Sequence, residues 1–471
     1  MSADYDLVII GVGAAGLTGG PFAVRLGART ALVERDRIGG DCTWTGCVPS
    51  KTLVKAARLA QQMRTAANYG LPSHEPPVDF GTVMQHVKRV IDVIYQPTAP
   101  ESLRGKGMDV LLGEPRFRDA HHITVDGQNV TASKTIVCTG AHPFVPAIPG
   151  LAEVDYRTYL DIWDLEALPR HMIVVGAGAI GCELAQAFRR LGADITLLEA
   201  NESISQDPDV AAVIGEEFAD EGIDIRQGTT ADRVWQDGMG IHVDAGGQEI
   251  TGDVLLIAVG RRPNVHDLGL EEAGVEYSEK GIRVDRHLRT SQKDVYAAGD
   301  CAGSLQFSHY AGWQAFMAVT NALLPGNHAG FSDQVPWCIF TDPEVAQVGL
   351  TEKQARERYG KNALTYVWPM NKVDRALNEG EAKGFLKLVY HDKGNILGVT
   401  IVAAQAGEMI NEWVVAMKEG FAIDQLVNSI HVYPSYSMAT LQATEAITVD
   451  RLLSGLKGRI IKGVARTKSK E

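Results

Sequence analysis

Short apolar runs recur along the chain, and two of them open the same longer pattern. The first run, residues 6–10, leads straight into a Gly-x-Gly-x-x-Gly stretch at residues 11–16. The second, residues 172–175, leads into another such stretch at residues 176–181. A continuous apolar run is typical of a strand buried on both faces of a parallel sheet. Each pattern therefore predicts a strand, a tight glycine turn and a helix.

Both patterns continue in the same way. A second apolar run follows each predicted helix and ends on an acid, Glu34 in the first copy and Glu199 in the second. The interval from first glycine to acid is identical in the two copies. Glycines at such a turn let backbone N–H groups approach a pyrophosphate, and the acid can accept the ribose hydroxyls. Two copies predict two dinucleotides.

The region between the two copies predicts a packed helix and a passage from one domain into the next. Apolar side chains recur at helical spacing over residues 83–94, which predicts a helix packed on one face. Residues 135–140 predict a strand that reaches a nucleotide. Three prolines at 143, 146 and 149 mark the passage into a second domain.

Composition narrows the class of protein. The chain has 471 residues, enough for about three domains, and a net charge of -13, which argues against nucleic acid as the main partner. The N-terminus shows no basic region before its apolar run, and no stretch is long and apolar enough to span a bilayer. Six cysteines in so long a chain do not suggest a secreted disulfide scaffold. We expect a cytoplasmic protein.

The candidate chemistry lies in residues 39–51, a Gly- and Thr-rich stretch that carries two cysteines. Cys42 and Cys47 precede a Val-Pro-Ser-Lys run that predicts a helix start, so we expect Cys42 on a loop and Cys47 at a helix N-terminus. The helix N-terminus and nearby Lys51 both favour thiolate over thiol. A structural disulfide and half of a zinc site are the alternatives. The other four cysteines are isolated, so we predict redox chemistry and no metal ligands.

These stretches together resemble class I pyridine nucleotide–disulfide oxidoreductases, the family of dihydrolipoamide dehydrogenase, glutathione reductase and mercuric reductase. Residues 39–51 resemble the redox-disulfide signature, and residues 254–264 resemble the segment that closes the nicotinamide domain. Residues 295–300 resemble the second flavin-binding segment, and residues 336–352 resemble the start of the dimerisation domain.

The resemblance implies an α/β fold with two Rossmann-like dinucleotide-binding domains and a C-terminal α+β dimerisation domain. It places an FAD-binding domain at residues 1–150 and 265–332 and an NAD-binding domain at residues 151–264. The dimerisation domain would occupy residues 333–455, followed by a basic tail at 456–471. FAD and NAD are the implied cofactors.

The resemblance also assigns roles to individual residues. Cys47 matches the thiol that faces the flavin and Cys42 the thiol that attacks substrate, while Lys51 and Glu183 match the ion pair beside flavin N5. The FAD-binding residues implied are Gly11, Gly13, Gly16, Glu34, Lys51, Glu114, Thr139, Gly140, Asp300 and Ser308. The NAD-binding residues implied are Gly176, Gly178, Gly181, Glu199 and Gly260.

The second repeat favours NADH over NADPH. Glu199 would repel a 2′-phosphate, and no Lys or Arg stands between it and Arg226 to receive one. The third glycine, Gly181, also resembles the NAD-linked members of the family.

The terminal acceptor is left open by residues 431–438. Relatives that exchange disulfides carry a His-x-His-Pro run followed by Glu, and that second His and Glu form a base supplied by the partner subunit. Here Tyr433 and Met438 stand at those two positions. Neither accepts a proton near neutral pH. Mercuric reductase also has a tyrosine there, but this sequence carries no C-terminal cysteine pair.

Three functions follow from these residues. The first is an NADH-dependent FAD enzyme whose acceptor needs no His–Glu base: a metal ion such as Hg(II), a quinone or an unusual disulfide. The second is a dihydrolipoamide dehydrogenase subunit of a multienzyme complex. The third is a redox-sensing flavoprotein scaffold. The family relation also implies a homodimer with shared active sites. The basic residues after Arg451 predict either a weak contact with an anionic membrane or a last interface helix with a frayed basic end.

Overall fold

The computed structural model describes residues 3–303, 305–454, 458 and 460, which form two compact units. The first unit comprises Met1–Ile204 and Phe218–Ser332, and the second comprises Ser205–Glu217 and Asp333–Glu471. Residues 205–217, which the sequence places in the NAD-binding domain, thus pack with the C-terminal part of the chain. The domain boundaries at 150 and 264 stay predictions.

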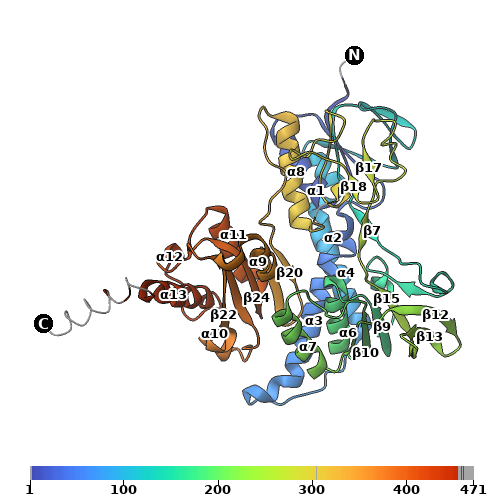
Figure 1. Ribbon diagram of the computed structural model, residues 1–471. Coiled ribbons are helices and arrows are strands. Elements are labelled where there is room, and N and C mark those ends of the chain that lie inside the picture. The colour runs from blue at the N-terminus through green and yellow to red at the C-terminus, as the bar shows by residue number, and fades with distance from the viewer. Residues whose placement is uncertain (1–2, 304, 455–457, 459, 461–471) are drawn as a thin grey trace. The chain divides into compact units, whose positions relative to one another are not determined.

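The first unit is built on a largely parallel sheet, whose main strands lie in the order β3-β2-β1-β6. In β1, Leu7 and Ile9 pack on one face of the sheet, while Val8 and Ile10 pack on the other. This is why the run is apolar at every position. Helices α1 and α8 lie side by side over the face that carries Leu7 and Ile9 (Figure 1). These elements are β1 (Tyr5–Ile10), α1 (Ala14–Arg25), β2 (Thr30–Glu34), β3 (Met108–Leu112), β6 (Gln128–Val137), β19 (Val295–Ala297) and α8 (Ser308–Leu323).

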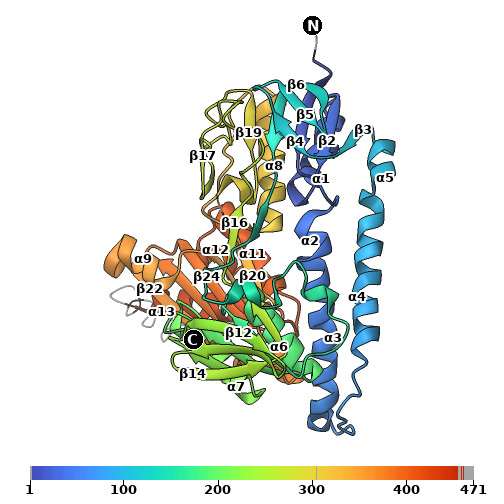
Figure 2. The same ribbon diagram turned by 90° about the vertical axis from the view of Figure 1, so that its right-hand side faces the viewer.

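Shorter elements complete this part of the first unit. The long helices α3 and α4 run side by side (Figure 2), and α4 confirms the helix predicted over residues 83–94. The remaining elements are α2 (Gly40–Trp44), α3 (Cys47–Thr65), α4 (Phe80–Tyr95), α5 (Pro100–Gly105), β4 (Pro115–Phe117), β5 (His122–Val125), β17 (Tyr277–Ser278) and β18 (Gly281–Ile282).

A second parallel sheet holds the second repeat, in the order β11-β10-β9-β15-β8. A three-stranded antiparallel sheet packs against it through a shared apolar core. Two short strands, β7 and β16, pair antiparallel. The elements are β7 (Ala141–Pro143), β8 (Tyr156–Arg157), β9 (His171–Val175), α6 (Ala179–Leu191), β10 (Asp194–Glu199), β11 (Asp224–Gln227), β12 (Ala231–Asp237), β13 (Gly240–Ala245), β14 (Gln248–Gly252), β15 (Val254–Ile257) and β16 (Arg261–Pro263).

The two repeats adopt one local geometry, as the sequence predicts. Each is a strand, a glycine turn, a helix and a second parallel strand: β1-α1-β2 and β9-α6-β10. A Cβ on Gly16 would overlap the carbonyl oxygen of Gly11, and a Cβ on Gly181 would overlap that of Gly176. The third glycine of each motif is therefore required for the helix to pass so close to the turn.

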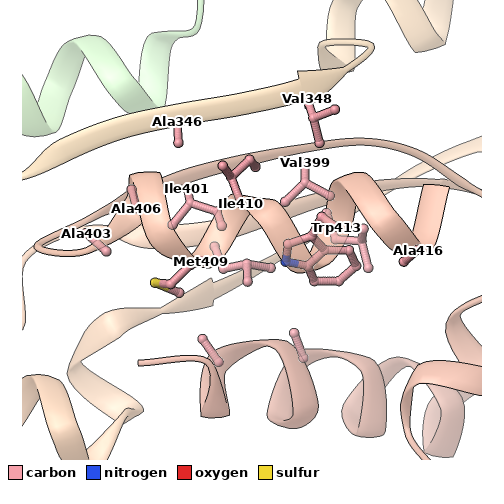
Figure 3. Packing of buried hydrophobic residues seen from close by; sticks show 14 of the residues in the cluster. Ala346, Val348, Val399, Ile401, Ala403, Ala406, Met409, Ile410, Trp413 and Ala416 are labelled. Carbon is pink, nitrogen blue, oxygen red and sulfur yellow. The ribbon is translucent and has the colours of Figure 1, made fainter. Parts of the chain in front are cut away.

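The second unit is an antiparallel sheet in the order β20-β21-β24-β23-β22, covered by helices. Trp413 of α11 is fully buried among Val399, Ile401 and Ile410 (Figure 3). Its elements are β20 (Trp337–Ile339), β21 (Glu344–Gly349), α9 (Glu352–Tyr359), β22 (Ala363–Pro369), α10 (Asp374–Asn378), β23 (Phe385–His391), β24 (Ile396–Ala403), α11 (Ala406–Lys418), α12 (Ile423–Leu426) and α13 (Met438–Leu453).

Lys387 explains why residues 205–217 belong to the second unit. This lysine of β23 is almost fully buried, and its ammonium group lies 2.7 Å from Asp207 and 2.6 Å from Asp209. Asp207 directly precedes α7 (Pro208–Asp220) and Asp209 lies in its first turn. A buried ammonium requires such partners, because an unpaired charge in the interior is costly.

The α/β fold class expected from the sequence is confirmed. Apart from residues 458 and 460, the predicted basic tail at 456–471 lies outside the described residues and stays a prediction. Within the described part of the chain, we find no helix with the length and apolar character needed to cross a membrane.

Candidate active site

The two cysteines of residues 39–51 lie on consecutive helices. Cys47 is the first residue of α3, as predicted. Cys42, expected on a loop, instead lies in the short helix α2. The backbone N–H groups of Thr45 and Gly46 both bond to the carbonyl oxygen of Asp41, at 2.9 and 2.5 Å, which closes this turn. A five-residue helix is only marginally stable on its own, so the sequence pattern does not predict it.

The surroundings of Cys47 stabilise its thiolate. A hydrogen bond from Cys42 lowers the pKa of Cys47 to about 6, aided by Ser308 and by the positive charge of Lys51 and opposed by burial. The Ser308 hydroxyl, at the first residue of α8, lies 3.5 Å from the Cys47 sulfur. Conversely, the hydrogen bond with Cys47 and burial raise the pKa of Cys42 well above its usual range. The pair therefore consists of one thiolate and one thiol.

Lys51 and Glu183 form the pair that the family resemblance implied. The Lys51 ammonium lies 2.6 Å from the Glu183 carboxylate, which is 5% exposed. Lys51 stands one turn into α3, on the same helix as Cys47, and Glu183 stands in the first turns of α6. The pair thus joins the cysteine segment to the helix of the second glycine motif.

Three further cysteines of the first unit are buried and inert. Burial raises the pKa of Cys182 to about 12 and that of Cys301 to about 11, and it raises that of Cys138 well above the usual value. A buried neutral thiol is a poor nucleophile. Their surroundings set them apart from Cys47.

Both glycine motifs end at helix N-termini suited to a dinucleotide. The residues before α1 and α6, Gly13 and Gly178, make no side-chain capping bond, and neither first turn contains an acid. Their exposed N–H groups can therefore receive a pyrophosphate. The Glu34 carboxylate accepts a 2.8 Å bond from the Val12 N–H, and the Glu199 carboxylate accepts a 2.9 Å bond from the Ala177 N–H.

The carboxylates of Glu34 and Glu199 can still accept hydrogen bonds from a ribose. Each carboxylate offers about four lone-pair sites. Glu34 accepts bonds from Val12 and Asp36, whereas Glu199 accepts one from Ala177 and two from Asn201. Glu34 therefore keeps about two sites for hydroxyl groups and Glu199 about one. The residues present thus fit FAD at the first motif and a pyridine nucleotide at the second.

The other residues expected at FAD are distributed around the first sheet. Glu114 follows the end of β3, next to the end of β2, and is exposed. The Thr139 hydroxyl donates to the Asn264 carbonyl at 2.7 Å, and Gly140 has a φ of 71°. The Asp300 side chain is 12% exposed, and its partial burial raises its pKa, although its bond to Arg261 at 2.6 Å opposes the shift.

Residues at the second dinucleotide site are fewer. Gly260 has a φ of 129° and open space where a Cβ would stand, at the end of the segment after β15.

Arg261, which the sequence marks only as part of a motif, bonds to both Asp300 and Asp41. Nothing in the local pattern marks Asp41 as its partner, because the two are far apart in sequence.

The second unit carries the acceptor-side residues. The Tyr433 hydroxyl donates to Asp374 at 2.7 Å, and this bond raises the pKa of the phenol. Met438 begins α13 and packs against the hydrophobic core of the unit. His431 is nearly buried, with its Nε2 2.6 Å from Glu412 and its Nδ1 3.0 Å from the Ser429 carbonyl.

Two hydrogen-bond acceptors fix the orientation of the His431 ring. Its Nε2 faces the Glu412 carboxylate and its Nδ1 faces the Ser429 carbonyl, so both ring nitrogens are directed at acceptors within the second unit.

Comparison with known proteins decides the family. Residues 5–315 match the family described as pyridine nucleotide-disulphide oxidoreductase, and residues 335–444 match its dimerisation domain. The chain belongs to the pyridine nucleotide-disulphide oxidoreductases. This flavoprotein family depends on FAD and a pyridine nucleotide, so the chain is an NAD(P)H-dependent FAD disulfide oxidoreductase.

Individual pyridine nucleotide-disulphide oxidoreductases resemble the chain over most of its length. It is 35% identical to a mercuric reductase from Staphylococcus aureus over 96% of this chain and 84% of that one. It is also 35% identical to a dihydrolipoyl dehydrogenase from Thermus scotoductus, over 94% and 97%. The HOCl-induced flavoprotein disulfide reductase RclA from Escherichia coli has the same fold, with a TM-score of 0.86, 29% identity, and coverage of 94% of this chain and 100% of that one.

Proposed function

We propose that this oxidoreductase uses NADH to reduce a thiophilic metal ion, with Hg(II) and Cu(II) as candidate substrates, through the Cys42–Cys47 pair. The observation that carries the proposal is the absence of a usable base among the described acceptor-side residues 431–438. The Tyr433 hydroxyl donates a hydrogen bond to Asp374, Met438 packs against the core, and both ring nitrogens of His431 face acceptors.

Dithiol and disulfide substrates need that base, whereas a metal ion does not. A thiol that attacks a disulfide must first lose its proton, and general-base help in such steps contributes about 10²–10⁴-fold. A metal ion binds directly to thiolate sulfur. The Cys47 thiolate and the neighbouring Cys42 are therefore suited to a thiophilic ion without further proton transfer from the second unit.

FAD, when bound, supplies the two-electron relay between NADH and the disulfide. The glycine motif at residues 11–16 and Glu34 would hold its adenosine and pyrophosphate, and Asp300 its ribityl or phosphate part. Lys51 would place a positive charge near the isoalloxazine ring, balanced by Glu183 at 2.6 Å. Ser308 and Lys51 both stabilise the Cys47 thiolate.

The electrons balance in a simple cycle. Two electrons and one proton convert the Cys42–Cys47 disulfide into the Cys47 thiolate and the Cys42 thiol. The pair then passes two electrons either to one Hg(II), giving Hg(0), or to two Cu(II), giving two Cu(I). The S–S bond forms again, and the proton of Cys42 is released.

The relatives support a metal substrate. Several of the matching proteins are mercuric reductases. RclA from Escherichia coli is also known as a Cu(II) complex, at 28% identity and a TM-score of 0.86.

Steady-state assays with NADH and one acceptor at a time test the proposal. We expect turnover with Hg(II) or Cu(II) and very low turnover with lipoamide and glutathione disulfide. Tyr433→His combined with Met438→Glu should raise dithiol exchange far more than either change alone, because an unoriented imidazole is a poor base. Efficient lipoamide turnover by the unmodified enzyme would overturn the proposal.

A dihydrolipoamide dehydrogenase is the second candidate, favoured by the Thermus scotoductus relative, of which the chain covers 97%. The same assay separates the two functions. A quinone acceptor belongs in the panel, since it also needs no base. If NADH reduces FAD but no acceptor is turned over, the result would instead support a redox-sensing flavoprotein scaffold.

We further propose that NADH is preferred over NADPH. Glu199 is buried at the tip of β10, and Arg226 is engaged with Asp224 at 2.9 Å. A 2′-phosphate would therefore meet a carboxylate with no cation supplied by residues 200–225. A kcat/KM for NADPH equal to that for NADH would contradict this.

The last part of the proposal is a homodimer with shared active sites. Ile430 and Val432 are 100% and 79% exposed, beside Tyr433 at 66%. Apolar side chains so exposed favour cover by a second copy, in line with the dimerisation-domain match. Full activity of a monomeric species at low concentration would refute it.

A further inference from the structure

Cys42 lies in a helix that is too short to be stable on its own. Helix α2 has five residues, and it follows Gly39 and Gly40, whose φ angles are 108° and 56°. A single helical turn is unfavourable alone. While the disulfide exists, it ties Cys42 to α3. Once the disulfide is reduced, other contacts must keep Cys42 beside Cys47.

The structure contains such contacts on the residue before Cys42. The Asp41 carboxylate accepts a 2.6 Å bond from Arg261 and a 2.9 Å bond from the Tyr159 hydroxyl. Arg261 also donates to the Tyr159 hydroxyl at 3.0 Å and to Asp300 at 2.6 Å. Its guanidinium lies 5.2 Å from the centre of the Tyr159 ring. We call Asp41, Tyr159, Arg261 and Asp300 the Asp41 cluster.

A second anchor holds the residue that follows α2. The Trp163 indole N–H lies 2.9 Å from the Thr45 carbonyl and 2.8 Å from the Tyr159 carbonyl. Trp163 is 7% exposed, so this indole is fixed by its surroundings. Cys42 is therefore held from both sides by residues 159–163 and by Arg261, all outside its own segment.

We propose that Asp41 and Tyr159 are positioning residues for Cys42, which keep it beside Cys47 when the pair is reduced. The inference rests on the redox role proposed for the two cysteines. Neither residue touches the reacting sulfurs; both act through the backbone of α2.

The direction of the effect follows from the chain entropy. In the oxidised protein the disulfide restrains α2 whether or not the Asp41 cluster is intact. In the reduced protein that covalent restraint is gone, and the position of α2 depends on the cluster. Weakening the cluster therefore releases more freedom in the dithiol than in the disulfide. The equilibrium shifts toward the dithiol, and the reduction potential of the pair becomes less negative.

Two substitutions test this on the FAD-loaded enzyme. Asp41→Asn removes the charge that Arg261 and Tyr159 bind, and Tyr159→Phe removes one hydroxyl while keeping the ring. We expect each to favour the dithiol about three- to fivefold in glutathione redox buffers, quantified by alkylation and mass spectrometry. The double variant should fall short of the product of the two, because both changes break a bond to the same carboxylate. A tenfold change would be about 30 mV in the two-electron potential.

The alkylation rate of the reduced enzyme is the second readout. Iodoacetamide should modify Cys42 several-fold faster in both variants. Tyr5→Phe is the matched control, because it removes a tyrosine bond to Asp109, 2.9 Å long, in the same unit. It should alter neither the equilibrium nor the rate.

The outcomes distinguish this inference from the function on which it rests. An unchanged dithiol equilibrium in the flavin-loaded double variant would overturn the positioning role alone. If Asp41→Asn loses flavin through Arg261 and Asp300, then Tyr159→Phe, which leaves that ion pair intact, decides between the outcomes. A flavin spectrum that ignores Cys42→Ser and Cys47→Ser would instead remove the redox role itself. No acceptor is needed for any of these measurements.

Discussion

Lys51 and Glu183 stand on the helices of two different sequence segments, yet their charged groups lie 2.6 Å apart. Lys51 follows the redox cysteines on α3, and Glu183 follows the second glycine motif on α6. The pair is asymmetric, since the Glu183 side chain is 5% exposed and that of Lys51 is 36% exposed.

Because of this asymmetry, replacing Lys51 and replacing Glu183 should lower the free energy of unfolding by different amounts. Lys51→Met leaves a buried carboxylate without this cation and should lower the free energy of unfolding by about 3–5 kcal/mol. Glu183→Gln leaves a half-exposed ammonium, which water can reach, and should cost about 1–3 kcal/mol. Chemical denaturation measures both. Glu272→Gln, at an exposed pair with Arg116, serves as control and should cost at most about 1 kcal/mol. Equal losses in the first two variants would contradict the account.

The pH dependence of the reduced enzyme follows from Cys47. Its pKa of about 6 means that the thiolate is present above pH 6 and is lost as the pH falls through that value. With FAD bound and the disulfide reduced by NADH, the thiolate-to-flavin charge-transfer band should therefore fade below about pH 6. Cys47→Ser should abolish the band, and Cys42→Ser should enhance it in the resting enzyme.

The largest contribution to that low pKa is the hydrogen bond from Cys42. Cys42→Ser keeps a donor at this position, whereas Cys42→Ala removes it. In absorbance titrations, the midpoint of the band should therefore lie at higher pH in the alanine variant than in the serine variant. Identical midpoints would show that Cys42 does not stabilise the thiolate.

Ser308 gives a further prediction for the same titration. Its hydroxyl lies 3.5 Å from the Cys47 sulfur and favours the thiolate. Ser308→Ala should raise the midpoint of the same titration by up to about one unit, while Ser308→Thr, which keeps the hydroxyl, should stay near the parent. A change in flavin content without a change in midpoint would instead favour the FAD-binding role that the resemblance implied.

His431 should be structural in this enzyme. His431→Gln loses at least one of the bonds to Ser429 and Glu412 and should lower stability by about 1–3 kcal/mol. Metal turnover with NADH should change less than about twofold in the folded variant, because both ring nitrogens of His431 are directed at Ser429 and Glu412. A tenfold loss of turnover, with stability unchanged, would place His431 in the chemistry.

Trp413 tests the core of the second unit. Its ring is fully buried, but its indole N–H has no hydrogen-bond partner among the described residues. Trp413→Ala should cost about 3–5 kcal/mol of unfolding free energy. Trp413→Phe should cost far less, because the smaller ring leaves a modest cavity and removes an unsatisfied donor. Thermal unfolding of the two variants compares them directly.

Local pattern is enough to predict the two nucleotide-binding repeats. Their apolar runs, glycines and terminal acids all act within about thirty residues, so strand, turn and helix agree with one another before any tertiary contact forms. The same holds for Cys47, whose place at a helix start follows from the adjacent Val-Pro-Ser-Lys run.

The contacts that hold Cys42 cannot be predicted in this way. Asp41 and Arg261 meet only because β16 is brought beside the cysteine segment by the fold, and neither position has a local pattern that names the other. Helix α2 escapes prediction for the same reason: its stability depends on these distant partners and not on its own residues. Likewise, His431 stands in a recognisable motif, but its partner Glu412 comes from another helix, α11.

The paired bonds from Glu34 to Val12 and from Glu199 to Ala177 constrain any redesign of coenzyme preference. An engineer who replaces Glu199 with a neutral or basic residue to admit NADPH would also free the Ala177 N–H, and with it one restraint on the second glycine turn. Affinity for the shared pyrophosphate would then fall along with the repulsion. A successful switch must add both a cation for the 2′-phosphate and a new acceptor for that N–H, so at least two substitutions have to arrive together.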